Sequence, residues 1–165
     1  MAHPQDGGDR RITILIDADA TPRDALRTAD KLASRFGAVV VTVSSINHEY
    51  HRPLHIAVDA HPQAVDMEII RRIVRGRVFV VVTQDYGLAA LVLCKGARAV
   101  SPRGLVYTEA NIDRLLLERE LHARQRRATG RSRGPKARSD EDVQNFERAM
   151  EQTLFEVTGA DTGLD

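Results

Sequence analysis

Several features that define particular protein classes are scarce or absent in this sequence of 165 residues. It has no tryptophan, only four phenylalanines and three tyrosines, and a single cysteine, Cys94. One cysteine excludes an internal disulfide and a zinc site built from several cysteines. The apolar runs are much shorter than the roughly 20 residues of a membrane helix, and the opening residues, MAHPQDGGDRR, lack the apolar core of a signal peptide. We therefore expect a cytoplasmic protein without a membrane partner, and the sequence gives no indication of its oligomeric state.

The pattern of apolar runs predicts an α/β fold. Short runs, most of them rich in β-branched residues, alternate with segments of helical periodicity. The predicted strands are Ile12–Ile16, Ala38–Val43, Leu54–Val58, Val78–Val82 and Ala97–Val100. The predicted helices cover about 21–37, 62–76, 85–96, Glu109–Gln125 and Ser139–Val157. We expect Thr21 to be the N-cap of the first of these helices, and a Ser139-x-x-Asp142 capping pattern begins the last. Strands that alternate with helices, without a tight hairpin between them, favour right-handed βαβ units and a mainly parallel sheet in a three-layer domain.

The net charge of +1 conceals an uneven distribution of charge. Residues 122–138, which we call the basic segment, hold seven of the 24 lysines and arginines and none of the 23 acidic residues. We predict that this segment is a flexible linker between an α/β domain over residues 1–121 and a C-terminal helix and tail, residues 139–165, packed on the same domain. Such a run of cations is either simply solvated or contacts a polyanion. The expected nucleic-acid contacts are Arg124, Arg126, Arg127, Arg131, Arg133 and Lys136.

Acidic residues follow the predicted strands. Asp17 and Asp19 follow the first strand, Asp59 the third and Asp85 the fourth, while Asp66 lies early in the helix after Asp59. Because the carboxyl ends of parallel strands meet at one edge of a sheet, we expect these side chains to gather there. Clustered carboxylates repel one another, and a hard cation such as Mg²⁺ relieves that repulsion. Aspartate is also common at turns and helix N-caps, so each residue, Asp85 above all, has an alternative structural explanation.

Five stretches carry a resemblance to a known family. They are DADATP (17–22), VDMEII (65–70), VVTQDYGLAALVLCKGA (81–97), PRGLVYTEANIDRLLLERELHARQRR (102–127) and RGPKARSDED (133–142). With these stretches the sequence resembles the YaiI/YqxD family of bacterial proteins, which is grouped with the PIN-like nuclease folds. The resemblance extends from about residue 12 to about residue 150, and TQDYGLA and HARQRR…GPK are its most specific parts. It implies a three-layer PIN-like (Rossmannoid) α/β domain.

The resemblance also implies a site, by position. The first-strand, mid-chain and TxD aspartates correspond to Asp17, Asp66 and Asp85, the expected catalytic residues, and Asp19 joins them as an expected ligand of Mg²⁺ or Mn²⁺. The expected supporting residues are Thr83, Ser44 and Asn47. The implied reaction is metal-assisted hydrolysis of a phosphodiester in RNA or another single-stranded nucleic acid, without a covalent nucleophile. This nuclease function is inferred from the superfamily fold, which by itself does not fix an activity.

Two positions depart from the family pattern. Thr21 stands where many members have cysteine, which suggests that no cysteine chemistry is required there. Gln63 stands where many members have a further aspartate. The second difference leaves the acidic cluster one carboxylate smaller and weakens the expected metal affinity, unless Asp59 takes that place.

A phosphatase is the first alternative, because Asp17, Asp19 and Thr21 satisfy DxDxT, the first motif of haloacid-dehalogenase-like phosphatases. Asp17 would then be the nucleophile that forms an aspartyl-phosphate, and Asp19 the general acid. The phosphate-binding groups of such an enzyme would be Ser44 or Ser45, together with Lys95. That superfamily also needs a later motif with two nearby carboxylates, whereas TQDYGLAAL supplies only Asp85.

A non-catalytic module that binds nucleic acid through the basic segment is the second alternative, since Arg-rich segments often become ordered on RNA. Only Tyr107 among the aromatic residues lies near the segment, so base stacking is poorly supplied. A separate group, His48, His51 and His55, suggests zinc, but few further ligands are close in sequence. We expect that stretch to be a surface or phosphate-contacting loop instead.

Overall fold

A mainly parallel sheet lies at the centre of the molecule. The computed structural model describes residues 11–46, 50–131 and 136–159. Its strands are β1 (Ile12–Asp17), β2 (Val39–Ser45), β3 (His55–Val58), β4 (Val78–Val82), β5 (Arg98–Val100) and β6 (Val106–Tyr107). These described strands form one sheet in the order β3-β2-β1-β4-β5-β6, in which only β6 is antiparallel to its neighbour. Because the order reverses between β1 and β4, their carboxyl ends form a topological switch point, where ligands bind in such sheets.

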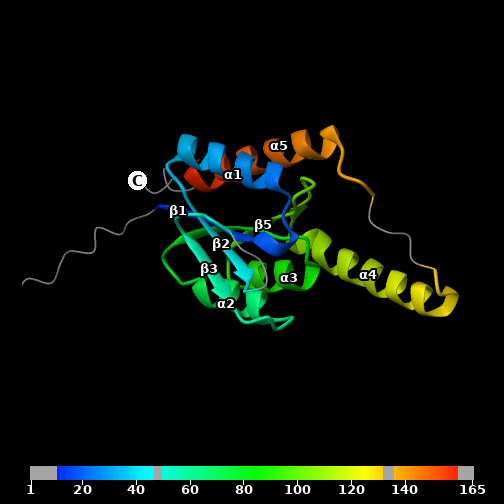
Figure 1. Cartoon of the computed structure of the whole chain (residues 1–165). Helices are drawn as coiled ribbons and strands as arrows, with labels where there is room; N and C mark the ends of the chain where they lie inside the picture. Colours follow the sequence, from blue (N-terminus) through cyan, green and yellow to red (C-terminus); the bar gives the residue numbers. More distant parts are fainter. Residues whose placement is uncertain (1–10, 47–49, 132–135, 160–165) are drawn as a thin grey trace, which may run out of the picture.

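Helices cover both faces of this sheet (Figure 1). They are α1 (Arg23–Phe36), α2 (Ala64–Arg72), α3 (Tyr86–Cys94), α4 (Glu109–Thr129) and α5 (Asp140–Gly159). Side chains alternate across β1, so Ile14 and Ile16 pack with Leu32 of α1 and with α5, whereas Leu15 packs with Ile69 of α2 and with α3 and α4. The predicted three-layer α/β fold is confirmed. No helix in the described residues is long and apolar enough to span a membrane.

The last strand was not predicted from the sequence. β6 has only two residues and pairs with β5 through a turn in which the Gly104 N–H donates to the Ser101 carbonyl oxygen at 2.9 Å. Gly104 has φ +90°, and a Cβ atom there would lie 2.5 Å from the carbonyl carbon of Asn145 in α5. The turn thus needs glycine both for its conformation and for the close approach of α5. A strand of two residues has no periodicity that could reveal it.

The start of α1 also differs from the prediction. Thr21 was expected to cap the helix, but its Oγ1 donates to the carbonyl oxygen of Asp17 at 2.7 Å. The helix begins at Arg23, with Pro22 in the N-cap position and no side-chain cap. Between β1 and Thr21, residues Ala18–Ala20 form a single 3-10 turn, η1. The Thr21 hydroxyl therefore binds the backbone at the end of β1 and does not cap the helix.

The basic segment is not a linker throughout, and the predicted domain boundary after residue 121 falls inside α4. The helix continues to Thr129 and ends at Gly130, whose φ is +64°. Its sequence there, HARQRRAT, contains mostly good helix formers, and an exposed helix needs no apolar face once it is nucleated by packed turns. The buried residues of α4, Ile112 and Leu115, lie in its first half, and the second half extends away from the sheet (Figure 1).

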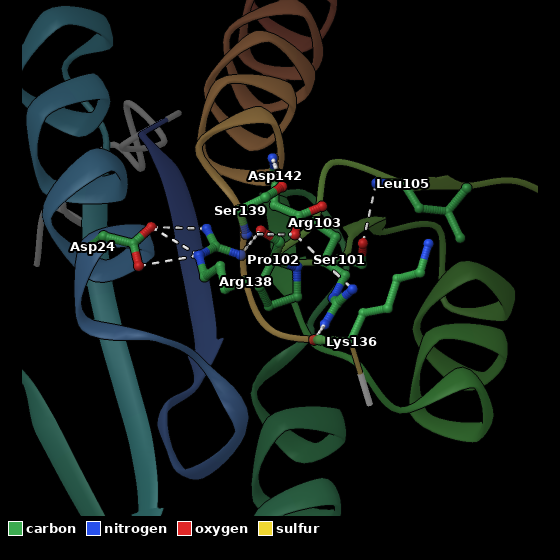
Figure 2. Close-up of polar contacts among 9 residues, drawn as sticks. All are labelled: Asp24, Ser101, Pro102, Arg103, Leu105, Lys136, Arg138, Ser139 and Asp142. Atoms are coloured by element: carbon green, nitrogen blue, oxygen red, sulfur yellow. Dashed lines mark hydrogen bonds and ion pairs between the residues drawn. The ribbon is translucent and has the colours of Figure 1, made fainter. Parts of the chain in front are cut away.

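The last residues of the basic segment are fixed to the α/β body (Figure 2). Arg138 donates from Nε and Nη2 to the carboxylate of Asp24 in α1, at 2.8 to 3.0 Å, and from Nη1 to the carbonyl oxygen of Pro102 at 2.6 Å. Arg103 donates to the carbonyl oxygen of Lys136. The expected cap of the C-terminal helix is present, since Ser139 Oγ accepts from the Asp142 N–H at 3.2 Å. Arg138, one of the seven cations of the basic segment, thus joins α1 to the turn between β5 and β6.

Candidate active site at the carboxyl ends of β1 and β4

Asp17 occupies the centre of the switch point. It is the last residue of β1, and only 8% of its surface is exposed. Thr83, which follows β4 and is fully buried, donates from Oγ1 to Asp17 Oδ2 at 3.3 Å. The same Oγ1 accepts from the backbone N–H of Asp85 at 3.0 Å. The threonine therefore couples the ends of the two central strands and orients the Asp17 carboxylate.

Three further carboxylates act on Asp17. Burial is the largest cause that raises the pKa of Asp17, from 3.8 to about 6. The negative charge of Asp66 adds most to that rise after burial, followed by the charges of Asp19 and Asp85, while the hydrogen bond from Thr83 opposes it. Burial and then the charge of Asp85 raise the pKa of Asp66, which lies in the first turn of α2. The fold thus brings four of the five expected aspartates, Asp17, Asp19, Asp66 and Asp85, to one edge of the sheet, which we call the acidic edge.

Asp85 combines the two roles that the sequence left open. Its Oδ1 accepts from the backbone N–H of Leu88 at 3.1 Å, which caps the N-terminus of α3 as expected of a helix N-cap. The same atom lies 3.7 Å from Nη1 of Arg119 in α4, and both side chains are about half exposed. A Cβ atom on Gly87 would lie 3.1 Å from this oxygen. Capping therefore orients Asp85 without removing its charge from the acidic edge.

The other expected site residues lie in different surroundings. Asp19 is exposed, and its Oδ2 accepts from the Ser45 N–H at 2.8 Å, which ties η1 to the end of β2. Ser44 is buried with its Oγ 2.8 Å from Nε2 of His55, so its hydroxyl is engaged away from the carboxylates. Asp59 is not among the charges that shift Asp17, and it lines a separate cavity of about 690 Å³ beside α2. Asn47 lies outside the described residues.

The phosphatase alternative loses its lysine in this arrangement. Lys95 follows the last residue of α3 and donates from Nζ to the carbonyl oxygen of Ile70 near the end of α2, at 2.9 Å. Because both helices begin at the acidic edge, with Asp85 and Asp66, their last residues lie toward the opposite edge of the sheet. Lys95 is thus about a helix length from Asp17, too far to bind a phosphate on it.

The cations of the basic segment are dispersed over its fold. Arg124 Nε lies 3.3 Å and Arg127 Nη2 4.0 Å from Oε1 of Glu120, which precedes Arg124 by one turn of α4 and Arg127 by two. Arg126 and Arg131 instead line an open cavity of about 310 Å³ near the end of α4. Lys136 is exposed, and Arg133 lies outside the described residues. Among the described residues, the expected nucleic-acid contacts thus divide into two cations near Glu120 and cations that line the cavity or are exposed.

The carboxylates can be compared with the needs of a metal ion. Among the described residues, the structure contains no group of three Asp, Glu, His or Cys side chains placed closely enough to hold one metal ion. Mg²⁺ and Mn²⁺ prefer oxygen ligands, and Mg²⁺ commonly takes one or two protein carboxylates and keeps several waters. Asp17 and Asp66 are partly desolvated carboxylates that raise each other's energy when both are charged. The donor chemistry of this pair fits Mg²⁺ or Mn²⁺.

Comparison with known proteins identifies the family. The family described as "Uncharacterized BCR, YaiI/YqxD family" matches residues 15–156. The chain belongs to the YaiI/YqxD family. It is similar to a UPF0178 protein of Heliobacterium modesticaldum, 44% identical over 146 residues that cover 88% of this chain and 99% of the relative. A UPF0178 protein of Ruminiclostridium cellulolyticum is 42% identical over 139 residues, 83% of this chain and 88% of the relative.

A solved structure of a mutant of Rae1 (YacP) from Bacillus subtilis is a more distant match to this YaiI/YqxD-family chain. It is 22% identical, and the match covers 88% of this chain and 98% of that one with a TM-score of 0.43. A likeness of this size carries no argument about activity.

Three residues at the acidic edge of this YaiI/YqxD-family protein were missed from the sequence. Besides Arg119, they are Gln84, whose Nε2 donates to the Ala20 carbonyl oxygen at 2.6 Å, and Tyr107, whose hydroxyl donates to the Thr83 carbonyl oxygen at 3.1 Å. All three lie within the stretches that carry the family resemblance, 81–97 and 102–127. That position was the one available signal, because neither charge pattern nor periodicity distinguishes them.

Proposed function

We propose that this protein is a divalent-metal-dependent phosphodiesterase that cleaves RNA or another single-stranded nucleic acid at the carboxyl ends of β1 and β4. The observation that carries the proposal is the concentration of Asp66, Asp19 and Asp85 around a buried Asp17. Carboxylates that repel one another at a ligand-binding edge destabilise the fold, and the usual partner that relieves this repulsion is a hard cation.

Asp17 and Asp66 are the residues that would hold Mg²⁺ or Mn²⁺, with Asp19 or Asp85 next to them. A divalent ion bound there would supply polarisation of a phosphoryl oxygen and a lower pKa for an attacking water. Thr83 holds the Asp17 carboxylate in one orientation through the 3.3 Å hydrogen bond. Arg119 lies beside Asp85 and, at about half exposure, can turn its guanidinium toward a phosphate oxygen when the substrate arrives.

Cleavage of labelled oligonucleotides by the full chain tests the proposal. Single-stranded RNA, duplex RNA and single-stranded DNA are incubated with Mg²⁺, Mn²⁺ or a chelator. We expect metal-dependent cleavage of single strands by the parent, loss of cleavage in Asp17→Asn, and unchanged cleavage in the control Asp59→Asn. The control removes a carboxylate of the same type from a cavity outside the acidic edge.

Two results would replace the proposal with an alternative. Formation of a phosphorylated Asp17 during turnover of a phosphomonoester would establish the phosphatase. Binding of RNA without cleavage, equally tight in the parent and in Asp17→Asn, would establish the non-catalytic module that binds through the basic segment.

A further inference from the structure

A further cavity lies directly beside the acidic edge and has no part in the proposed hydrolysis. Its volume is about 470 Å³, and it lies between the residues after β1, the first two turns of α1 and residues 50–52. Small-molecule sites in proteins span roughly 300–1,000 Å³. The cavity is therefore large enough to receive one nucleotide.

The walls of this cavity are cationic. Arg23, Arg27 and Arg52 line it together with His51, and none of its lining residues in the described part of the chain is acidic. Arg52 is only 20% exposed and pairs with Asp30 of α1, which fixes its guanidinium in the wall. Arg23 and Arg27 are exposed and have no ion-pair partner within the ranges that the structure describes. Two guanidinium groups thus remain available to a ligand.

A hydrogen bond connects the cavity to the backbone between two of the aspartates. Tyr50, which also lines it, donates from Oη to the carbonyl oxygen of Ala18 at 2.9 Å, between Asp17 and Asp19 in the sequence. Burial raises the pKa of Tyr50 most, and the charges of Asp19 and Asp17 raise it further, whereas Arg23 lowers it. The Tyr50 hydroxyl is therefore subject both to the negative charges of the acidic edge and to the positive charge of Arg23 in the cavity wall.

We infer that this cavity binds a phosphate group of the nucleotide next to the scissile bond. The inference rests on the proposed function, because it names where the substrate strand is held. An acidic edge repels a phosphodiester backbone, so a strand that reaches it needs cations close by. Arginine suits that task because its planar fork of donors matches the oxygens of phosphate. Arg23 and Arg27 make the direct contacts, and Arg52, held by Asp30, completes the cavity wall.

Binding measurements in a cleavage-deficient background test the inference. In the full-length Asp17→Asn protein, affinity is measured for a short single-stranded RNA carrying either a 5′-phosphate or a 5′-hydroxyl. The added pair Arg23→Gln and Arg27→Gln should weaken binding by about tenfold or more and reduce the salt slope by about 0.7 per lost phosphate contact. The matched control is Arg75→Gln with Arg77→Gln, two exposed arginines that precede β4 at the opposite edge of the sheet.

The two RNA forms identify the source of the phosphate. A loss confined to the 5′-phosphorylated strand assigns the cavity to a terminal phosphate, and an equal loss for both strands assigns it to an internal one. Unchanged affinity for both strands, or an equal loss in the control pair, would overturn the inference even if the parent enzyme cleaves RNA. If the parent shows no metal-dependent cleavage, but the Arg23→Gln and Arg27→Gln pair still weakens RNA binding, only the proposed function is overturned.

Discussion

The acidic edge of the sheet and the basic segment are built in opposite ways. The acidic edge draws Asp17, Asp66 and Asp85 from distant parts of the sequence, and the parallel topology concentrates their charges. The basic segment has its charges adjacent in sequence, and the fold disperses them, with Arg138 paired to Asp24 and Arg124 paired to Glu120. Charges that are far apart in the sequence can thus lie close together in the fold, and charges that are adjacent in the sequence can be separated by it.

Asp85 gives the strongest test of the acidic edge, because it both caps α3 and contributes charge. Asp85→Asn keeps a good N-cap residue but removes the charge. We expect cleavage to fall by about 100-fold or more, the scale seen when one electrostatic catalytic group is lost. The free energy of unfolding should change by less than about 0.5 kcal/mol. Loss of activity that tracks loss of stability in thermal melts would show that Asp85 acts only as a cap.

The raised pKa of Asp17 predicts a stability that depends on pH. Because the pKa is about 6 in the folded protein against 3.8 ordinarily, the folded state binds the proton more tightly, and stability falls as pH rises through that window. Asparagine cannot ionise, so Asp17→Asn should raise the free energy of unfolding at pH 7 in metal-free buffer by on the order of 2 kcal/mol. The gain should shrink toward about pH 4. Urea unfolding at both pH values measures it, and a gain of equal size at both would exclude ionisation as its cause.

Arg138 tests whether the end of the basic segment is structural. Its side chain is 17% exposed and that of Asp24 30%, so Arg138→Met leaves a partly buried carboxylate without its partner. We expect a loss of about 1.5 kcal/mol in the free energy of unfolding. The control Arg131→Met removes an exposed cation and should cost less than about 0.5 kcal/mol. Similar losses in both variants would contradict the assigned anchoring role.

The smallest effect is expected for the cations in the second half of α4 and just after it. Arg126 and Arg131 line an open cavity, whereas Arg124 and Arg127 lie near Glu120. Replacing the first pair with alanine should weaken single-stranded RNA binding by a few fold, and replacing the second pair should weaken it less, because Glu120 already offsets part of that charge. Titrations at two salt concentrations measure the difference. Equal effects of the two pairs would indicate that the affinity for RNA depends only on the total charge of this region.

Much of the fold and part of the site could be predicted because they depend on local patterns. Apolar runs predicted the five parallel strands to within about two residues, and the capping pattern predicted the start of α5. The aspartates were found because a parallel sheet places its strand ends at one edge. Arg119 and Gln84 could not be found in this way, since their roles depend on which residues of other segments they meet.

The sequence by itself determined the three-layer α/β architecture, because hydrophobic periodicity records which side of each element is buried. It also placed Asp17 at the end of a strand and Asp66 and Asp85 near the starts of two helices. Only the tertiary structure decided the sheet order with its switch point between β1 and β4, since periodicity does not say which strands are neighbours. It also decided that Arg138 serves the fold while Arg23 and Arg27 face a cavity, because the state of a charged side chain depends on the partners that packing brings to it.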